Sequence, residues 1–265
     1  MLRASAAAGF GAGAAASLEL FTPMTRTSQT GSYAEHVMRL EQSSLSKAEA
    51  MRLAVGGEFE AIGKLEYYLL RSLGLSDGHL VIDVGCGSGR LAVQLASCSG
   101  IKYVGTDVVP SLLDTARSLS GRSDWQFHLV EDLIIPCQDN SADFVTFFSV
   151  FTHLPHEASF KYLIEAARCL KPRGLVVASF LEFRIPCHWD TFMGSVLSDA
   201  PGQLNQFIDR DAVKAWADHC GLAIETFFDG DKPHIPIPEE IHWENGTSMK
   251  SLGNLGQSVV VLRKT

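Results

Sequence analysis

The chain has 265 residues, a hydrophobic fraction of 46% and a formal net charge of −8 at pH 7. A chain of this length can bury the core of one large domain, and none of its apolar runs is long enough to span a bilayer. The acidic balance and the lack of a Lys/Arg block argue against a nucleic-acid-binding protein.

The N-terminal stretch differs in composition from the rest. Residues 1–30 are rich in Ala, Gly, Ser and Thr, which is compatible with a dispensable extension or with a targeting peptide. We expect residues 1–40 to be a disordered or dispensable extension and residues 41–265 to form a single domain. The six cysteines are scattered without a Cys-x-x-Cys pair, and the histidines lack metal-ligand spacing. These features predict reduced thiols, a cytoplasmic location and no metal site.

Two helices are predicted before the first strand. Residues 44–55 have helical character up to the Gly56-Gly57 break, and the apolar spacing over 58–73 predicts a second helix that ends at Gly74. A β-type run at 79–84 follows.

This first strand leads into a glycine-dense turn and then a helix from Leu91. In a strand–turn–helix unit the backbone N–H groups of the turn and the helix N-terminus point toward one site, which favours binding of a nucleotide-type ligand. Gly85, Gly87 and Gly89 form the turn, whereas a dinucleotide fingerprint would require glycine where Arg90 stands.

Acidic residues follow the next two predicted strands. The strand at 101–106 ends at Asp107, about 20 residues after the glycine turn, where a carboxylate can accept hydrogen bonds from both ribose hydroxyls. The alternative is that Asp107 caps the helix that begins at Pro110. After the strand at 125–130, Asp132 can accept from an adenine amino group, or it is a solvated turn residue.

The remaining elements continue the alternation. Strands are predicted at 144–150, 175–180, 222–228 and 258–262, and helices at 160–170 and 211–220. Alternating strands and helices predict a doubly wound α/β fold with ligands at the carboxyl ends of parallel strands. The two long insertions, at about 181–207 and 229–257, are predicted to be lids.

The order of these features resembles the class I S-adenosylmethionine (SAM)-dependent methyltransferases. Asp83 with the glycine turn, then Asp107, then Asp132 resemble the first three motifs of that family, and 148–154 and 170–174 resemble the next two. The resemblance covers roughly residues 57–182 and 210–263. It implies a mostly parallel seven-stranded sheet with helices on both faces, an antiparallel last strand, and SAM as cofactor. The cofactor-binding residues that it implies are Asp83, Gly85, Cys86, Gly87, Gly89, Asp107, Val108, Glu131, Asp132, Leu133 and Ser149.

Methyl transfer to a small polar acceptor, most plausibly a hydroxyl of a sugar or secondary metabolite, is the activity that this resemblance implies. A hydroxyl needs a base, and His153 past the fourth strand is the first candidate; the alternative is that it caps the turn at Pro155. His156 is the second candidate. Glu58 and Phe59 are candidates for closing over the methionine end of the cofactor. Candidates for the acceptor wall are Glu182, His188, Trp189, Asp190, His234, His242 and Trp243.

Other functions remain open on the sequence alone. They are N- or C-methylation of a small molecule, an NAD(P)-linked oxidoreductase, and a domain that binds SAM without catalysis. The Asn-Pro-Pro-Tyr motif of amide and base methylation does not follow the fourth strand, and a Tyr-x-x-x-Lys dyad is absent from the sequence.

Overall fold

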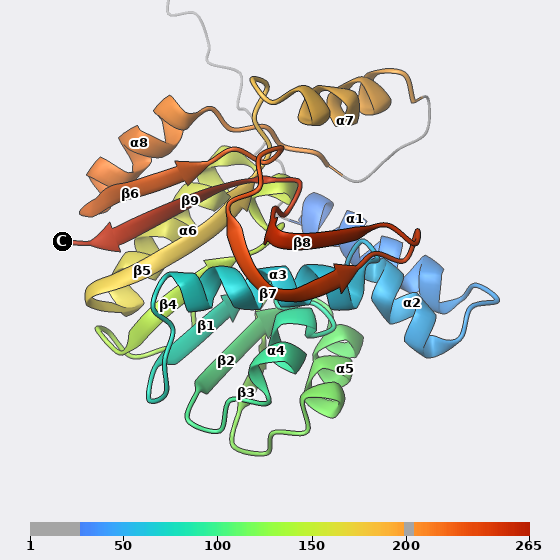
Figure 1. Ribbon diagram of the computed structural model, residues 1–265, viewed down its shortest axis with the longest axis horizontal. Coiled ribbons are helices and arrows are strands. Elements are labelled where there is room, and N and C mark those ends of the chain that lie inside the picture. The colour runs from blue at the N-terminus through green and yellow to red at the C-terminus, as the bar shows by residue number, and fades with distance from the viewer. Residues whose placement is uncertain (1–26, 199–203) are drawn as a thin grey trace, which may run out of the picture.

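A computed structural model describes residues 27–198 and 204–265 of the chain (Figure 1). The helices are α1 Thr27–Glu41, α2 Lys47–Ala54, α3 Phe59–Ser72, α4 Arg90–Leu95, α5 Pro110–Ser120, α6 His156–Cys169, α7 Pro186–Val196 and α8 Arg210–His219, with a 3₁₀ turn at Phe151–His153. The strands are β1 Leu80–Val84, β2 Lys102–Asp107, β3 Gln126–Leu129, β4 Ala142–Phe147, β5 Leu170–Phe180, β6 Leu222–Phe228, β7 Ile235–His242, β8 Ser248–Gly253 and β9 Ser258–Lys264.

Seven strands form one sheet in the order β3-β2-β1-β4-β5-β9-β6. The pairs among β1 to β5 are parallel, and β9 runs antiparallel to both β5 and β6. The sheet therefore confirms the predicted fold class, including the antiparallel last strand.

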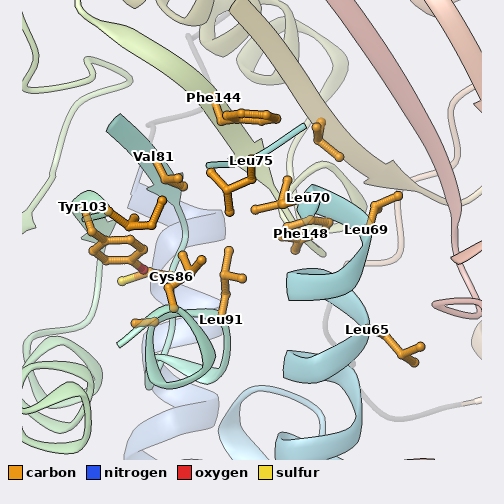
Figure 2. Packing of buried hydrophobic residues seen from close by; sticks show 14 of the residues in the cluster. Leu65, Leu69, Leu70, Leu75, Val81, Cys86, Leu91, Tyr103, Phe144 and Phe148 are labelled. Atoms are coloured by element: carbon orange, nitrogen blue, oxygen red, sulfur yellow. The ribbon is translucent and has the colours of Figure 1, made fainter. Parts of the chain in front are cut away.

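Both faces of this sheet are covered by helices. Apolar side chains of α3 and α4, including Leu65, Leu69 and Leu91, pack with Val81 and Phe144 on one face (Figure 2). The other face packs against α6 and α8 through a second buried cluster. The helical spacing of apolar residues that the sequence showed in these segments is thus explained by burial against the sheet.

Two strand boundaries differ from the prediction by three residues or more. The fourth strand ends at Phe147 rather than Val150, because Ser149 adopts a left-handed backbone conformation with φ of 58° that a strand cannot contain. The fifth strand begins at Leu170 rather than Leu175, and the extra residues are accommodated by a register shift against β4.

The prediction for residues 1–40 needs correction where the structure describes them. Residues 27–41 form α1, and Val37 on this helix is fully buried in a cluster with Met51 of α2 and Leu112 of α5. This helix is therefore packed against the domain, which differs from the disordered extension expected here. Residues 1–26 lie outside the described residues.

Each predicted insertion contains regular structure. The first includes α7, and the second forms the hairpin of β7 and β8, which lies across α3 in Figure 1. Glu239 on β7 accepts a hydrogen bond from the Tyr68 hydroxyl at 2.6 Å and pairs with Lys64 at 3.2 Å, both on α3. The hairpin is therefore attached to the same helix that covers the sheet.

Candidate functional site

A cavity of about 370 Å³ opens at the carboxyl ends of β1, β2 and β4. This is the edge of a parallel sheet where α/β folds bind ligands. Of the predicted site residues, eight line this cavity: Asp83, Gly85, Cys86, Gly87, Asp107, Val108, Ser149 and His153.

The glycine turn approaches its surroundings too closely for side chains. A Cβ atom on Gly85 would lie 2.5 Å from Cγ2 of Val150, and one on Gly87 would lie 2.4 Å from Cγ1 of Val55. Gly89 has a different role, because a Cβ atom there would lie 2.8 Å from Ala116 on α5. Gly89 thus permits close packing of α4 on α5 and is not part of the cavity wall.

Asp107 fixes the glycine turn as well as lining the cavity. Its carboxylate accepts hydrogen bonds from the backbone N–H of Gly87 at 2.9 Å and of Val109 at 3.0 Å. The side chain is 5% exposed, and this burial raises its pKa to about 6. The sequence left ribose binding and capping of the α5 entry as alternatives, and the geometry allows Asp107 to do both.

Asp83 is also buried and hydrogen-bonded. It accepts from the Tyr103 hydroxyl at 2.7 Å and from the Thr146 hydroxyl at 2.8 Å. Burial raises its pKa to about 6. The Asp83 carboxylate at the end of β1 is therefore held in place by hydroxyl groups of the two neighbouring strands, β2 and β4.

The cavity wall contains an ion pair that was not predicted from the sequence. Arg90 lies 2.7 Å from the carboxylate of Glu66 on α3 and donates to the carbonyl oxygen of Val55 at 3.0 Å. Burial raises the pKa of Glu66 to about 7. The one sequence feature that could have indicated this pair is Arg90 itself, which stands where a dinucleotide fingerprint has its last glycine.

A second cavity of about 200 Å³ shares several wall residues with the first, among them Glu66, Arg90 and Ser149. Ser149 accepts a hydrogen bond from Gln257 at 3.1 Å, and Glu58 also lines this second cavity. Phe59 is buried and does not line either cavity.

His153 lies in the wall of the larger cavity, and its hydrogen bond defines the tautomer of the neutral ring. Its Nδ1 donates to the carbonyl oxygen of Leu204 at 2.7 Å, and the Tyr33 ring of α1 stacks near it with centroids 6.4 Å apart. Burial lowers the pKa of His153. Because Nδ1 carries the hydrogen, Nε2 presents a lone pair, and it receives no hydrogen bond from any side chain or backbone group that the structure describes.

Several predicted residues lie elsewhere. Glu131 and Asp132 are exposed and, like Leu133, do not line the cavity; Val130 lines it instead. His156 hydrogen-bonds the carbonyl oxygen of Phe207 through Nε2 at 3.0 Å and lines neither cavity. The seven residues expected in an acceptor wall, from Glu182 to Trp243, line neither cavity.

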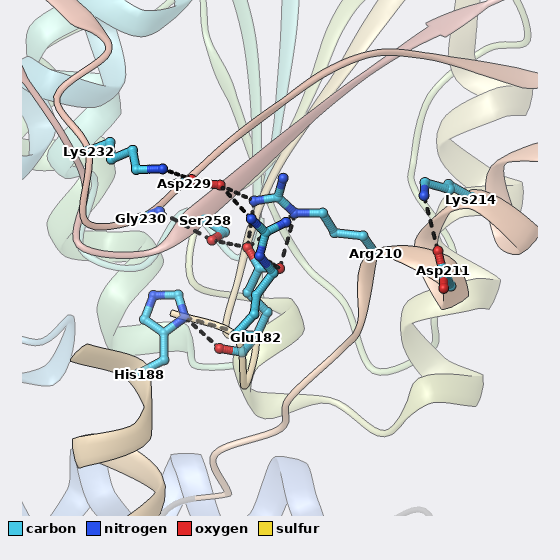
Figure 3. Close-up of polar contacts among 10 residues, drawn as sticks. Glu182, His188, Arg210, Asp211, Lys214, Asp229, Gly230, Lys232 and Ser258 are labelled. Atoms are coloured by element: carbon cyan, nitrogen blue, oxygen red, sulfur yellow. Dashed lines mark hydrogen bonds and ion pairs between the residues drawn. The ribbon is translucent and has the colours of Figure 1, made fainter. Parts of the chain in front are cut away.

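Two of those seven belong to a buried polar cluster (Figure 3). Glu182 is fully buried, pairs with Arg210 at 2.7 Å and accepts from the Ser258 hydroxyl at 2.5 Å. Asp229 pairs with the same Arg210, and His188 of α7 hydrogen-bonds the Glu182 backbone. The cluster joins α7, α8 and the ends of β5, β6 and β9, so it is an anchor for the insertions.

Across residues 27–198 and 204–265 there is no group of three or more His, Cys, Asp or Glu side chains placed to hold a metal ion. In the same part of the chain, every helix is too short or too polar to cross a membrane.

The sheet order, the glycine turn and the acid after β2 together define a class I Rossmann-like methyltransferase domain. A family model described as a methyltransferase domain matches residues 82–178. The chain is 31% identical over 172 residues to a ubiquinone biosynthesis O-methyltransferase of Xanthomonas euvesicatoria pv. vesicatoria, covering 61% of this chain and 69% of that protein.

A ubiquinone biosynthesis O-methyltransferase of Xylella fastidiosa is 29% identical over 168 residues, covering 60% of this chain; here the chain spans only 66% of the relative's length. The crystal structure of magnesium protoporphyrin IX methyltransferase from Synechocystis with bound S-adenosylhomocysteine (SAH) has the same fold. Its TM-score is 0.56 at 16% identity, over 87% of this chain and 94% of that one. The chain belongs to the class I SAM-dependent methyltransferases.

The residues of the cavity fit the family's cofactor. SAM has two positive groups, a sulfonium and an ammonium, and one negative carboxylate. The cavity wall contains three carboxyl groups, those of Glu66, Asp83 and Asp107, and one guanidinium, that of Arg90. This excess of acidic groups complements a cationic ligand. The turn without side chains also allows close approach of a ligand to the backbone.

Proposed function

We propose that the protein transfers the methyl group of SAM to a hydroxyl group of a small molecule with an apolar or aromatic body. The observation that carries this proposal is His153, kept neutral by burial and oriented by the hydrogen bond from its Nδ1–H to Leu204, with Nε2 available as a base. The names of the O-methyltransferase relatives support the same type of acceptor.

Bound SAM supplies an electrophilic methyl group. In the proposal, Asp107 accepts from the ribose hydroxyls, while Arg90 and Ser149 hold the polar tail. His153 takes the proton of the acceptor hydroxyl at Nε2, and the Leu204 carbonyl stabilises the imidazolium that forms. Alignment of acceptor and methyl carbon accounts for most of the remaining rate acceleration.

The groups around His153 favour one of the two acceptors that the sequence suggested, a sugar or a secondary metabolite. Tyr33, Val150 and Leu154 line the same cavity and offer apolar surface with few hydrogen-bonding groups, which suits a secondary metabolite better than a sugar. A cytoplasmic location, where SAM is supplied, is part of the same proposal.

The test is incubation of the purified protein with methyl-labelled SAM and matched panels of phenols, sugars and amines, followed by mass spectrometry. We expect label on phenolic hydroxyl groups. Label found on amines or carbon alone would contradict O-methylation, and label on sugars alone would contradict the apolar body. Tight binding of NADH without binding of SAM would instead support an oxidoreductase, and SAM binding without transfer to any acceptor in cell extract would support a non-catalytic domain.

A further inference from the structure

Tyr162 on α6 is a buried tyrosine whose hydroxyl lacks a partner among the described residues. The residue is 5% exposed, and its ring packs on Phe147 with centroids 5.7 Å apart. Within the described ranges 27–198 and 204–265 its hydroxyl makes no hydrogen bond, and its oxygen is not among the buried polar atoms without a partner, so it has accessible surface. The hydroxyls of Tyr33 and Tyr103, in contrast, donate to Ala54 and Asp83. Tyr162 lines the larger cavity, so a ligand can provide the missing partner.

The position of Tyr162 indicates which end of a ligand it meets. Glu66, Arg90 and Ser149 line both cavities and mark one end, whereas Tyr162 and Asp107 line only the larger one. The Asp107 carboxylate lies near enough to act electrostatically on Tyr162, and burial together with this carboxylate raises the pKa of that hydroxyl to about 12. The hydroxyl therefore stays protonated at neutral pH and can donate as well as accept.

The same end has apolar walls suited to a flat ring. Val108 and Val130, which follow β2 and β3, line the larger cavity and not the smaller one. Asp132, the residue that the sequence suggested for contact with the base, is exposed and outside the wall. A polar group is still needed there, because apolar contacts alone discriminate weakly between ring systems.

We propose that the Tyr162 hydroxyl hydrogen-bonds the adenosine half of bound SAM and is a specificity-determining residue for the cofactor. This inference rests on the cofactor of the family and not on the acceptor proposed above. Binding of SAH therefore tests it even when methyl transfer cannot be measured.

The experiment compares Tyr162→Phe with the parent protein by calorimetry, using SAH and 5′-methylthioadenosine, which lacks the methionine tail. Loss of one neutral hydrogen bond should weaken both ligands by about 3- to 10-fold. The melting temperature of the ligand-free variant should stay the same or rise, because the hydroxyl has no protein partner to lose among the described residues. Tyr68→Phe is the matched control, since its hydroxyl bonds Glu239 outside both cavities, and it should leave both affinities unchanged.

Three results would overturn the inference. The first is an unchanged SAH affinity of Tyr162→Phe. The second is a loss for SAH without a loss for 5′-methylthioadenosine, which would place Tyr162 at the tail. The third is a fall in melting temperature as large as that of Tyr103→Phe, whose hydroxyl is bonded to Asp83, because that would make Tyr162 a structural residue. If the parent bound neither ligand, the cofactor assignment would fail together with this inference.

Discussion

The Asp107 carboxylate accepts a hydrogen bond from the backbone N–H of Gly87 at 2.9 Å, so the acid that ends β2 holds the turn that follows β1. The second oxygen of the same carboxylate accepts from Val109 at the entry of α5. Asp107, which we expect to bind ribose, therefore also stabilises the backbone of the glycine turn. Its replacement should change both the affinity for SAM and the stability of the fold.

For Asp107→Ala we expect at least a tenfold loss of SAM affinity together with a lower stability. The substitution removes the contact to ribose and leaves two buried N–H donors without acceptors, at about 1–3 kcal/mol each. Asp107→Asn keeps one acceptor oxygen and should retain more of the stability than of the affinity. Calorimetry and urea unfolding measure the two quantities, and an unchanged SAM affinity in both variants would remove Asp107 from the ribose site.

For His153→Gln we expect kcat to fall by about 10²- to 10⁴-fold while SAM affinity changes little. A glutamine side chain is polar and of similar length but cannot take a proton, so the variant removes the basicity of residue 153 without leaving a large void. Equal turnover in the variant and the parent would exclude His153 as the base.

The lowered pKa of His153 also predicts the pH dependence of turnover. A base acts in its neutral form, so kcat should decline only as the pH is lowered through a pKa below the ordinary value of 6.5. The parent profile should contain this acidic limb, and the profile of His153→Gln should lack it.

Buried acids in the cavity predict a link between pH, stability and SAM binding. The pKa values of Asp83, Asp107 and Glu66, about 6, 6 and 7, lie above those of the unfolded chain, near 4. A raised carboxyl pKa stabilises the fold most below the unfolded pKa, and this contribution is lost as the pH rises through the folded pKa. The ligand-free protein should therefore lose stability between about pH 4 and 7.

Over the same interval SAM affinity should rise, because ionised carboxylates favour the cationic ligand. SAH lacks the sulfonium charge and should show a smaller rise. Thermal unfolding and calorimetry across this range check both statements. Equal pH dependence for SAM and SAH would contradict an electrostatic role of the acids toward the sulfonium.

For Glu182→Ala we expect a loss of about 3 kcal/mol in the free energy of unfolding with little change in SAM affinity. Arg210, whose side chain is 17% exposed, would keep Asp229 as an acidic partner at 2.5 Å but would lose the buried Glu182. Neither Glu182 nor Arg210 lines either cavity (Figure 3). Lys214→Ala is the control, because its pair with Asp211 is exposed and should contribute less than about 0.5 kcal/mol. A stable Glu182→Ala variant would show that the cluster does not anchor the insertions.

Local sequence patterns were sufficient to predict the order of the seven sheet strands, the glycine turn and the acid at residue 107, but not α1, α7 or the hairpin of β7 and β8. Apolar periodicity predicts helices and strands, and glycines without Cβ mark a tight turn. Because parallel strands end at one edge of the sheet, the same patterns also predicted that the strand-end residues Asp83 and Asp107 belong to one site, whereas Ser149 was added by the family resemblance.

Which other side chains reach the cavity depends on packing between segments that are distant in the chain. Arg90 and Glu66 are 24 residues apart, and their pairing requires α3 to lie beside α4. Asp132 has the sequence position of a binding residue but is exposed, whereas Tyr162 was not singled out by any sequence pattern and lines the cavity. Long-range packing brings Tyr33 of α1 to the site and keeps Glu182 away from it. Local patterns do not encode contacts between distant segments, so only the tertiary structure decided which of these side chains reach the cavity.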